Sequence, residues 1–357
     1  MNLNERLKMA TEVAGLGAIA HEKPGAWLPD AVMRLSLGLT RERALAGRPY
    51  LDDAELRAAY VAMYWPVSYL QTEEVFSIVG GKLGRVLDIG GGTGASAAAA
   101  LDAGATSVTI LDHAGDALGF CQTLFKGEPV ETIKTNAEDF APAKKFDTIL
   151  GVHVLNELFG ADEDRQTLLL ATVNSWMEHL TPNGRLIIIE PALKVLGQDL
   201  LKIRDALVAA GMHIDAPCIF QGACPALIDN DWCHTSMIWT PPHWVTRLAD
   251  ASNLDRTRIT MSYLVVSQNA AVVEVPEGAS DLARVVSEPL HTKGRLRYLV
   301  CGTKGRYPIV TPESRVGDDT QAMKRLPPAT MVEIGPTVTK GDGEDVSKGY
   351  IKVLERP

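Results

Sequence analysis

The spacing of apolar residues changes near residue 80, and this change divides the chain. Before it, apolar residues recur every three or four positions, most regularly in 34–47 and 52–80, which predicts amphipathic helices. Asp52 or Asp53 is well placed to cap the second helix, and Pro66 should kink or end it. We therefore expect an N-terminal helical region.

Between residues 85 and 190, short apolar runs alternate with helical patterns. The runs predict strands at 85–90, 107–112, 131–136, 147–152 and 185–190. The patterns between and after them predict helices at 94–103, 114–125, 163–179 and 196–210. Such alternation is typical of a parallel sheet with helices on both faces, and strands that are almost wholly apolar are buried on both faces. The fold class is therefore predicted to be α/β.

Residues 211–257 interrupt this rhythm with prolines, tryptophans, histidines and three cysteines. After them, 259–268 and 295–302 look like an antiparallel pair of strands that closes the sheet. The remaining residues alternate short β segments with Gly, Pro and Asp turns. We expect three parts: a helical region at 1–80, an α/β domain at 81–302 with a cysteine-rich insertion at 211–257, and a β-rich extension at 303–357.

Composition and charge narrow the class of protein. Of 357 residues, 46% are hydrophobic and 22% are charged, as in a soluble globular protein with a real core. The net charge of −9 argues against broad coating of nucleic acid. We see no secretory signal, no transit peptide and no apolar run long enough to cross a bilayer. We therefore expect a cytoplasmic protein with no membrane partner.

A glycine-rich loop follows the first expected strand, as Asp88-x-Gly90-x-Gly92-x-Gly94. Glycine lets the backbone turn tightly, and it lets a ligand approach where a Cβ would block it. The helix N-terminus that follows offers free N–H groups to a carboxylate or a ribose oxygen. Asp112, at the end of the next expected strand, suits hydrogen bonds to ribose hydroxyls. The loop therefore predicts a nucleotide-containing ligand.

Two kinds of cofactor fit this loop. Gly90, Gly92 and Ala95 also satisfy the loose dinucleotide pattern, so a nicotinamide or flavin cofactor and a vestigial pocket stay open as alternatives. S-adenosylmethionine is favoured because the Asp88 carboxylate would repel a pyrophosphate but suits the ammonium group of the methyl donor. Later segments follow the methyltransferase order, at 135–140, 146–158 and 180–192. We expect a class I methyltransferase sheet, which is Rossmann-like, with bound S-adenosylmethionine.

Candidates for chemistry lie near the third and fourth expected strands. Glu138 and Asp139 should flank the adenine, and His153 should face the crevice outside the carboxyl ends of the strands. Glu157 or His153 could act as a general base, although His153 could equally be an ordinary histidine at a strand end. The chain lacks the Asn/Asp-Pro-Pro-Tyr/Phe turn common in base-amine methylation, and no cysteine nucleophile lies near that strand. Methyl transfer can proceed largely by positioning, so catalysis stays open.

Four of the five cysteines lie late in the chain and could bind a metal. Cys218, Cys224, Cys233 and Cys301 are separated by five, eight and 67 residues. Structural zinc sites usually contain close cysteine pairs, whereas spaced single thiolates fit a [4Fe–4S] cluster better. Zinc and ordinary thiols stay open as alternatives. Cys121 is most simply a buried apolar residue.

Six segments in order carry a resemblance to a known family. They are DIGGGTGAS, HVLNEL, IIIEPA, ACPAL with DWCH, SYLVVS and RLRYLVCG. Over roughly residues 30–310 the chain resembles the methyltransferase-like small-ribosomal-subunit proteins, whose mitochondrial members act in assembly of the mitoribosomal small subunit. The block that contains Cys-Pro and Trp-Cys-His is the most specific part, because generic methyltransferases lack it. The missing transit peptide indicates a bacterial-type member.

The resemblance implies a [4Fe–4S] cluster on Cys218, Cys224, Cys233 and Cys301, an S-adenosylmethionine pocket and binding to small-subunit rRNA. Four thiolates would saturate the cluster, so we interpret it as structural. The chain is then a methyltransferase acting on the small ribosomal subunit; the alternatives are a non-catalytic assembly factor and a small-molecule methyltransferase. RNA contact needs basic surface, which we expect at Lys293, Arg295, Arg297, Lys304, Arg306, Lys324 and Arg325.

Overall fold

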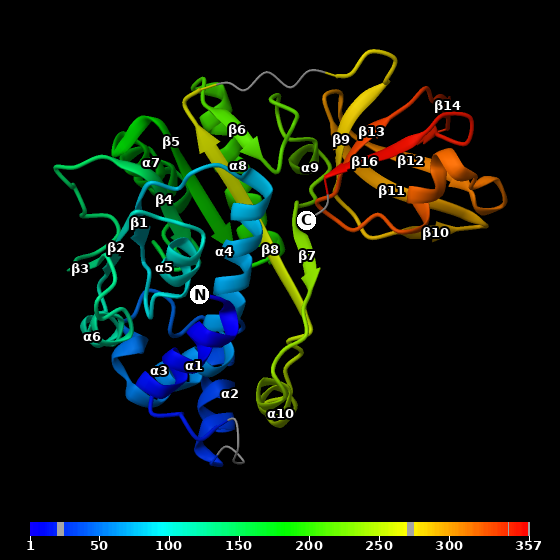
Figure 1. Ribbon diagram of the computed structural model, residues 1–357. Coiled ribbons are helices and arrows are strands. Elements are labelled where there is room, and N and C mark those ends of the chain that lie inside the picture. The colour runs from blue at the N-terminus through cyan, green and yellow to red at the C-terminus, as the bar shows by residue number, and fades with distance from the viewer. Residues whose placement is uncertain (20–24, 270–274, 342, 356–357) are drawn as a thin grey trace. The chain divides into compact units, whose positions relative to one another are not determined.

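The structure, a computed structural model, describes residues 1–19, 25–269, 275–341 and 343–355. Parts of all three expected regions, at 20–24, 270–274, 342 and 356–357, lie outside the described residues. The chain forms two compact units (Figure 1): unit 1 is residues 1–191 and 238–259, and unit 2 is residues 192–237 and 260–357. The division into three regions stays a prediction.

Unit 1 begins with helices, as the apolar spacing predicted. They are α1 (Leu3–Val13), α2 (Trp27–Leu39), the 3-10 turn η1 (Tyr50–Asp52), α3 (Ala54–Met63) and α4 (Trp65–Val79). Asp53 caps α3, since its carboxylate accepts hydrogen bonds from two backbone N–H groups of the first turn. Pro66 lies in the first turn of α4, where its missing N–H costs nothing. The predicted helix over 34–47 is too long, because positive φ angles at Arg43 and Gly47 are incompatible with a right-handed helix.

A later helix completes the helical part of unit 1. It is α10 (His243–Ala251), and it packs against α2 and α3. Its buried residues Val245, Leu248 and Ala249 follow the three- and four-residue spacing of one helix face. They share a core with Leu28 and Leu35 of α2. The end of the expected cysteine-rich insertion is therefore part of the helical core of unit 1.

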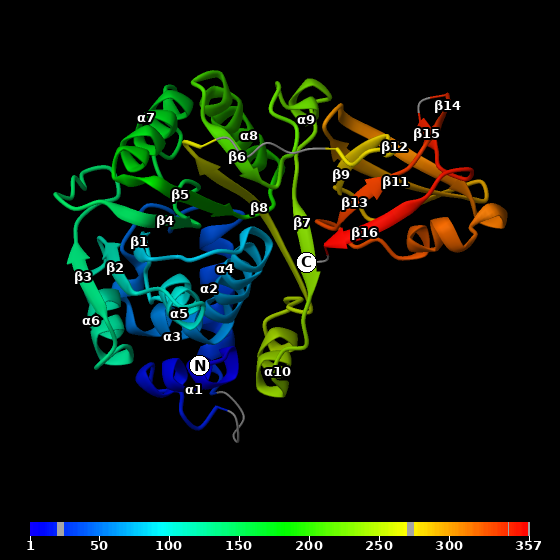
Figure 2. The same ribbon diagram turned by 45° about the horizontal axis from the view of Figure 1, so that its top comes forward.

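The sheet of unit 1 is parallel and carries its strands in the order β3-β2-β1-β4-β5. Its elements are β1 (Arg85–Ile89), α5 (Ala95–Asp102), β2 (Ser107–Asp112), α6 (Gly115–Leu124), β3 (Val130–Lys134), β4 (Phe146–Val152), α7 (Arg165–Glu178) and β5 (Leu180–Glu190). Figure 2 shows β4 and β5 between α7 on one side and α4 and α5 on the other. The α/β class is confirmed, and this is the class I methyltransferase fold. Strand order reverses between β1 and β4, which is where such sheets bind ligands.

Unit 2 starts with α8 (Lys194–Ala209) and then holds short elements around the cysteines. These are β6 (His213–Ala216), α9 (Pro225–Ile228) and β7 (Thr235–Ile238), followed by the longer β8 (Arg258–Ser267). β8 pairs with β6 in the antiparallel sense and also with β7. The predicted pairing of 259–268 with 295–302 is wrong, because the second of these segments belongs to another sheet.

That other sheet forms the β-rich end of unit 2, in the order β14-β15-β12-β11-β9-β13-β16. Its elements are β9 (Asp281–Val285), β10 (Leu290–Thr292), β11 (Arg295–Gly302), β12 (Gly305–Pro312), η2 (Glu313–Arg315), η3 (Asp318–Lys324), β13 (Met331–Ile334), β14 (Val338–Lys340), β15 (Gly343–Asp345) and β16 (Ile351–Glu355). On β11 the buried residues Leu296, Tyr298 and Val300 alternate with residues of the opposite face. Because side chains alternate along a strand, Cys301 lies on the face away from this core.

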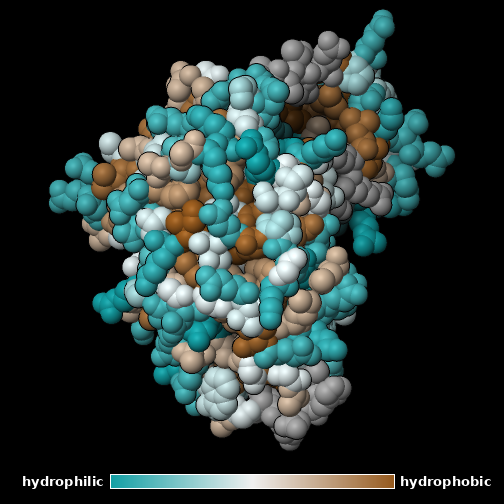
Figure 3. Space-filling view, turned by 60° about the vertical axis from the view of Figure 1, so that its left-hand side comes forward, coloured by the Kyte–Doolittle hydropathy of each residue, from teal (hydrophilic) through white to brown (hydrophobic). Residues whose placement is uncertain are grey.

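The surface is largely polar on the side that Figure 3 presents, where hydrophilic side chains surround scattered apolar ones. Large exposed apolar side chains include Trp27, Met33 and Leu37 on α2. Single exposed apolar residues are ordinary in folded proteins. Among the described helices, none has both the length and the apolar character needed to cross a membrane.

Candidate functional site

The glycine loop of unit 1 has the backbone that its sequence predicts. Gly90, Gly92 and Gly94 have φ angles of 65°, 51° and 77°, in the left-handed region that favours glycine. The neighbouring side chains also leave no room for a Cβ atom, which would lie 2.5 Å from Val154 on Gly90 and 2.6 Å from Phe125 on Gly94. Both the turn and the packing therefore require glycine here.

Two predicted acids hold this loop, each in a different way. Asp112 accepts hydrogen bonds from the backbone N–H groups of Gly92 and Ala114, both at 2.8 Å. Asp88 is fully buried and accepts a bond of 2.6 Å from the Ser96 hydroxyl, and its burial raises its pKa to about 7. Within the described part of the chain, Asp88 Oδ1 has no hydrogen-bond partner. A buried acceptor of this kind needs a donor, which a bound ligand can supply.

His153 lies just after β4 at φ 59°, where its ring nitrogen Nε2 is 2.7 Å from Gln71 Oε1. Burial lowers its pKa to about 4, so the ring is neutral at pH 7. In the tautomer that donates from Nε2 to Gln71, Nδ1 is an acceptor, and it has no partner among the described residues. Such a weakly basic imidazole is a poor general base near neutral pH.

Glu157 follows on the same turn and is the better-placed base. Its two carboxylate oxygens accept hydrogen bonds of 3.3 Å from the Tyr50 hydroxyl and the Gly47 N–H. Burial raises its pKa to about 7, which is close to the pH at which proton transfer is most efficient. No motif in the sequence pointed to Tyr50, because only the tertiary fold brings η1 to the end of β4.

Residues 43–53, which we call the strap, run across the carboxyl ends of three strands of unit 1. The Arg43 guanidinium donates to the carbonyl oxygen of Asn156 after β4. The side chain of Leu51 comes so close to Gly92 that a Cβ there would lie 3.0 Å from it. Asp52 accepts a bond of 2.8 Å from the backbone N–H of Asp116, at the start of α6. The strap therefore covers the crevice in which the sequence placed the methyl donor.

A further acid in the crevice had no role in the sequence reasoning. Glu190, the last residue of β5, is buried and accepts hydrogen bonds from the backbone N–H groups of Leu155 and Asn156 at 2.8 and 3.2 Å. Burial raises its pKa to about 8. Its only sequence signal was an acid ending an apolar strand. Glu190 fixes the turn that carries His153 and Glu157.

Glu138 and Asp139 lie in the turn after β3, and both are exposed. Asp139 accepts a hydrogen bond of 2.8 Å from the Asn136 side chain. The Trp176 indole donates to the Ala137 carbonyl and so ties this turn to α7. Their place beside an adenine stays a prediction.

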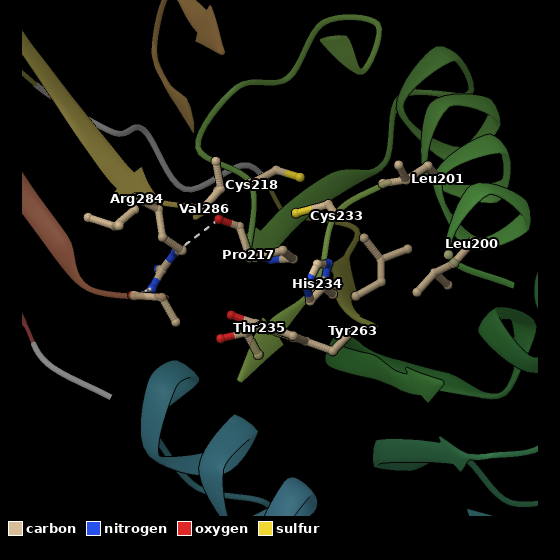
Figure 4. Close-up of a pocket in the computed structure, with 14 residues that line it drawn as sticks. Leu200, Leu201, Pro217, Cys218, Cys233, His234, Thr235, Tyr263, Arg284 and Val286 are labelled. Atoms are coloured by element: carbon tan, nitrogen blue, oxygen red, sulfur yellow. Dashed lines mark hydrogen bonds between the residues drawn. The ribbon is translucent and has the colours of Figure 1, made fainter. Parts of the chain in front are cut away.

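The four late cysteines come together within unit 2, from four different stretches of chain. Cys218 follows β6, Cys224 begins α9, Cys233 precedes β7 and Cys301 lies in β11. Burial raises the pKa of the Cys233 thiol, and the closeness of the other three sulfurs raises it further. Figure 4 shows the sulfurs of Cys218 and Cys233 pointing toward each other. As the side chains stand, no three His, Cys, Asp or Glu side chains of the described residues form a group that could hold one metal ion.

A hollow of about 470 Å³, part of it open solvent, adjoins two of these thiols. Figure 4 shows the residues around it, among them Cys218, Cys233 and Arg284. The Trp232 ring stacks on His234 with centroids 5.4 Å apart. Trp232 also packs on α8, where a Cβ on Gly197 would come within 3.0 Å of the indole. The Trp-Cys-His block thus packs on α8, which lines the same hollow as Cys233.

Comparisons with known proteins agree with this architecture. Residues 82–326 match the family model described as mitochondrial small ribosomal subunit Rsm22. No curated protein is significantly similar in sequence to the chain. The family match spans both the glycine loop and the four late cysteines.

Solved structures to which the chain is similar include several methyltransferases. The N-methyltransferase NodS from Bradyrhizobium japonicum, solved with S-adenosyl-L-homocysteine, is 14% identical over 57% of this chain and 87% of its own, with a TM-score of 0.38. The ribosomal protein L11 methylase from Lactobacillus delbrueckii subsp. bulgaricus is 19% identical over 57% and 78%, with a TM-score of 0.34. An rRNA methylase from Streptococcus thermophilus is 14% identical over 56% and 95%, with a TM-score of 0.31.

Proposed function

Because the chain belongs to the family described as mitochondrial small ribosomal subunit Rsm22, we propose that it is an S-adenosylmethionine-binding, methyltransferase-like protein that acts on or assembles the small ribosomal subunit. The observation that carries this proposal is the family match over residues 82–326. It includes the crevice of unit 1 and the thiol site of unit 2 in one chain. Neither feature alone would point to a ribosomal role.

The crevice of unit 1 suits S-adenosylmethionine, which supplies an activated methyl group when bound. The unpartnered Oδ1 of Asp88 is an acceptor for an ammonium group. Asp112 has further lone pairs for ribose hydroxyls beyond its two backbone bonds. The turn at Gly94 opens α5, whose first N–H groups can bind a carboxylate.

Two roles for this crevice remain, and each has a specific observation in its favour. Glu157, with its pKa near neutrality and Tyr50 as its partner, supports catalysis by accepting a proton from a methylated amine or hydroxyl. The strap supports a non-catalytic assembly role, since Leu51 lies against Gly92 and the carboxylate of Glu157 is already bound by the strap. Catalysis requires that the strap move away from Gly92 and Glu157, so that the methyl donor and the methyl acceptor can both bind.

In unit 2 we propose that Cys218, Cys224, Cys233 and Cys301 hold a [4Fe–4S] cluster, with zinc as the alternative. The convergence of four thiols from separate segments supports this, since such a cluster takes four cysteines. Four protein ligands leave no iron free for a substrate. The cluster would therefore be structural and would tie the loops after β6 and α9 to β11.

The proposed RNA contact surface lies on the β-rich part of unit 2. Lys293, Arg295 and Lys304 are exposed there and are available for phosphate contacts. Arg306 does not fit this role, because its guanidinium pairs with Asp231 at 2.7 Å and its side chain is 13% exposed. The basic surface that the sequence predicted over 293–306 is therefore smaller by one residue.

The test uses the full chain and two readouts. Extracts of cells that express it are fractionated on sucrose gradients, and binding of S-adenosylmethionine to the purified protein is measured by calorimetry. We expect the protein to sediment with small-subunit particles, and Asp112→Asn to bind the donor at least tenfold more weakly than the exposed control Glu163→Gln. Transfer of labelled methyl groups to the particles separates a catalyst from an assembly factor. The proposal would be refuted if the protein neither sedimented with small-subunit particles nor bound the donor.

A further inference from the structure

Three arginines surround the thiol site of unit 2, and no motif predicted them. Arg204 lies on α8, Arg284 on β9 and Arg306 on β12. Each of the three arginines contacts a loop segment that carries a cysteine.

The β-rich sheet places two of them on either side of Cys301. In the strand register, Cys301 is opposite Arg284 on β9 and opposite Arg306 on β12. Directly opposite side chains share a face of the sheet and lie about 5 Å apart at Cβ. The other face carries the apolar core with Val300 and Val285. One face of the sheet thus presents a thiol between two guanidinium groups.

Each arginine also binds the backbone or a side chain next to a loop cysteine. Arg284 Nε donates to the carbonyl oxygen of Pro217, the residue before Cys218, at 2.9 Å, as the dashed line in Figure 4 shows. Arg204 donates to the carbonyl oxygens of Phe220 and Gly222, between Cys218 and Cys224. These bonds connect the cysteine loop to α8 and β9 of unit 2.

The remaining loop cysteines are held in the same way. Arg306 pairs with Asp231, two residues before Cys233, at 2.7 Å. Asp205, the acid beside Arg204, accepts hydrogen bonds of 3.0 and 3.1 Å from the backbone N–H of Cys224. Every loop segment that carries a cysteine is therefore anchored by an arginine or by its acidic partner.

Two of the three arginines pair with an acid, but among the described residues Arg284 does not. Arg204 has Asp205 at 2.6 Å and Arg306 has Asp231. Arg284 is 6% exposed, and its hydrogen bonds go to the neutral carbonyls of Pro217 and Ala329. No carboxylate of the described residues lies within ion-pair distance of it. A buried cation without a counter-charge is costly, so the site calls for an anion beside Arg284.

We propose that Arg204, Arg284 and Arg306 form an arginine clasp that positions the three loop cysteines and neutralises an anionic iron–sulfur cluster, with Arg284 as the counter-charge of the cluster itself. The inference rests on the proposed cluster. A cluster held by four thiolates is anionic, and reduction adds a further negative charge. Arg284 therefore favours the reduced state, and it is a positioning residue rather than a ligand.

The test compares Arg284→Gln, Arg284→Lys and Arg315→Gln, the last being an exposed arginine of the same unit. Each full-length protein is purified without oxygen. Iron and acid-labile sulfide are measured per chain, the midpoint potential is followed by electron paramagnetic resonance, and cluster loss to a chelator is timed. These readouts do not depend on methyl transfer.

We expect Arg284→Gln to disfavour reduction about tenfold, a midpoint 59 mV more negative for one electron, while Arg315→Gln matches the unsubstituted protein. Arg284→Lys keeps the charge, so its potential should change less, but it loses the fork that binds Pro217 and Ala329 and should release iron several times faster. It also keeps the test decisive if Arg284→Gln fails to fold.

Two outcomes overturn the inference, and they differ in what else they refute. If iron and sulfide are present, and both Arg284 variants have the same potential and iron-release rate as Arg315→Gln, the clasp alone is refuted. An unsubstituted protein that holds zinc or no metal would refute the clasp together with the proposed cluster.

Discussion

The crevice of unit 1 and the thiol site of unit 2 are both buried polar sites, but they satisfy their charges differently. In the crevice, Asp112, Glu157 and Glu190 accept hydrogen bonds from N–H and O–H groups of the chain itself. In the thiol site, one buried and three half-buried thiols lie near Arg284, which is buried and has no carboxylate partner among the described residues. Within the described part of the chain, the crevice leaves single acceptors without a partner, such as Asp88 Oδ1, but its other acids are bound by the chain itself. It should therefore depend less on its ligand for folding than the thiol site, which holds a buried cation for which the described residues supply no counter-charge.

The largest expected effect comes from breaking the thiol site. Cys301→Ser should abolish the bound iron and lower the free energy of unfolding of unit 2 by about 4 kcal/mol or more, because a structural metal contributes directly to folding. Metal analysis and thermal unfolding measure both effects. Cys121→Ala is the matched control, since Cys121 is buried in unit 1 and should leave the iron unchanged. Equal iron in both variants would contradict the assignment of Cys301.

A somewhat smaller effect is expected from the glycine loop of the crevice. Gly94→Ala combines a left-handed φ with a Cβ 2.6 Å from the Phe125 ring, so it should lower the free energy of unfolding by about 2–4 kcal/mol and weaken donor binding. Gly104→Ala is the control, because its φ is 91° but its Cβ would meet nothing within 4 Å. It should show only the backbone strain of about 1–2 kcal/mol. Equal losses would mean that packing against Phe125 does not matter.

The pH dependence of the crevice gives a third comparison. Burial raises the pKa of Glu157 to about 7 in the folded state, above the value of about 4.3 in an unfolded chain. The contribution of Glu157 to the free energy of unfolding is therefore fully present below about pH 4.3 and is lost as pH rises through about 7. In Glu157→Gln the free energy of unfolding should therefore change less between these two pH values than it does in the exposed control Glu138→Gln. Parallel curves for the two variants would place the pKa of Glu157 near its ordinary value.

The smallest effect is expected on the exposed surface of unit 2. Arg295→Gln should weaken binding to small-subunit rRNA several-fold and reduce the slope of log K against log salt by about 1, because one phosphate contact is lost. Filter binding at several salt concentrations measures this slope. Arg315→Gln, an exposed arginine of the same β-rich part, serves as the comparison. An unchanged slope for Arg295→Gln would remove this residue from the proposed surface.

Much of unit 1 could be predicted from the sequence, because its signals are local. The apolar runs from residue 85 to 190 correspond to β1–β5 within one or two residues, apart from the earlier start of β5 at Leu180. Asp53 and Pro66 acted as the cap and the helix boundary that their chemistry requires. The glycines also adopt the left-handed φ angles that their spacing indicated. Backbone sterics and burial act over a few residues, so a short pattern records them.

The errors have a common physical cause. The segment 295–302 has the alternation of a strand, but alternation does not say which strand is its partner. The helix expected over 34–47 follows an apolar spacing, yet it ends at Leu39. The strap that takes the place of its last part is held by contacts with Gly92, Asn156 and Glu157, far away in sequence. Pairing and long-range packing are set by the whole fold.

By itself the sequence determined the α/β class, the glycine loop and the set of four cysteines, because glycine torsions, apolar periodicity and thiol chemistry belong to individual residues. Only the tertiary structure decided that Tyr50 meets Glu157, that Leu51 lies over the glycine loop, and that Arg284 and Arg306 flank Cys301. These arrangements join residues that lie from five positions apart, for Cys301 and Arg306, to 107 positions apart, for Tyr50 and Glu157. They arise from strand register and helix packing, which no local pattern records.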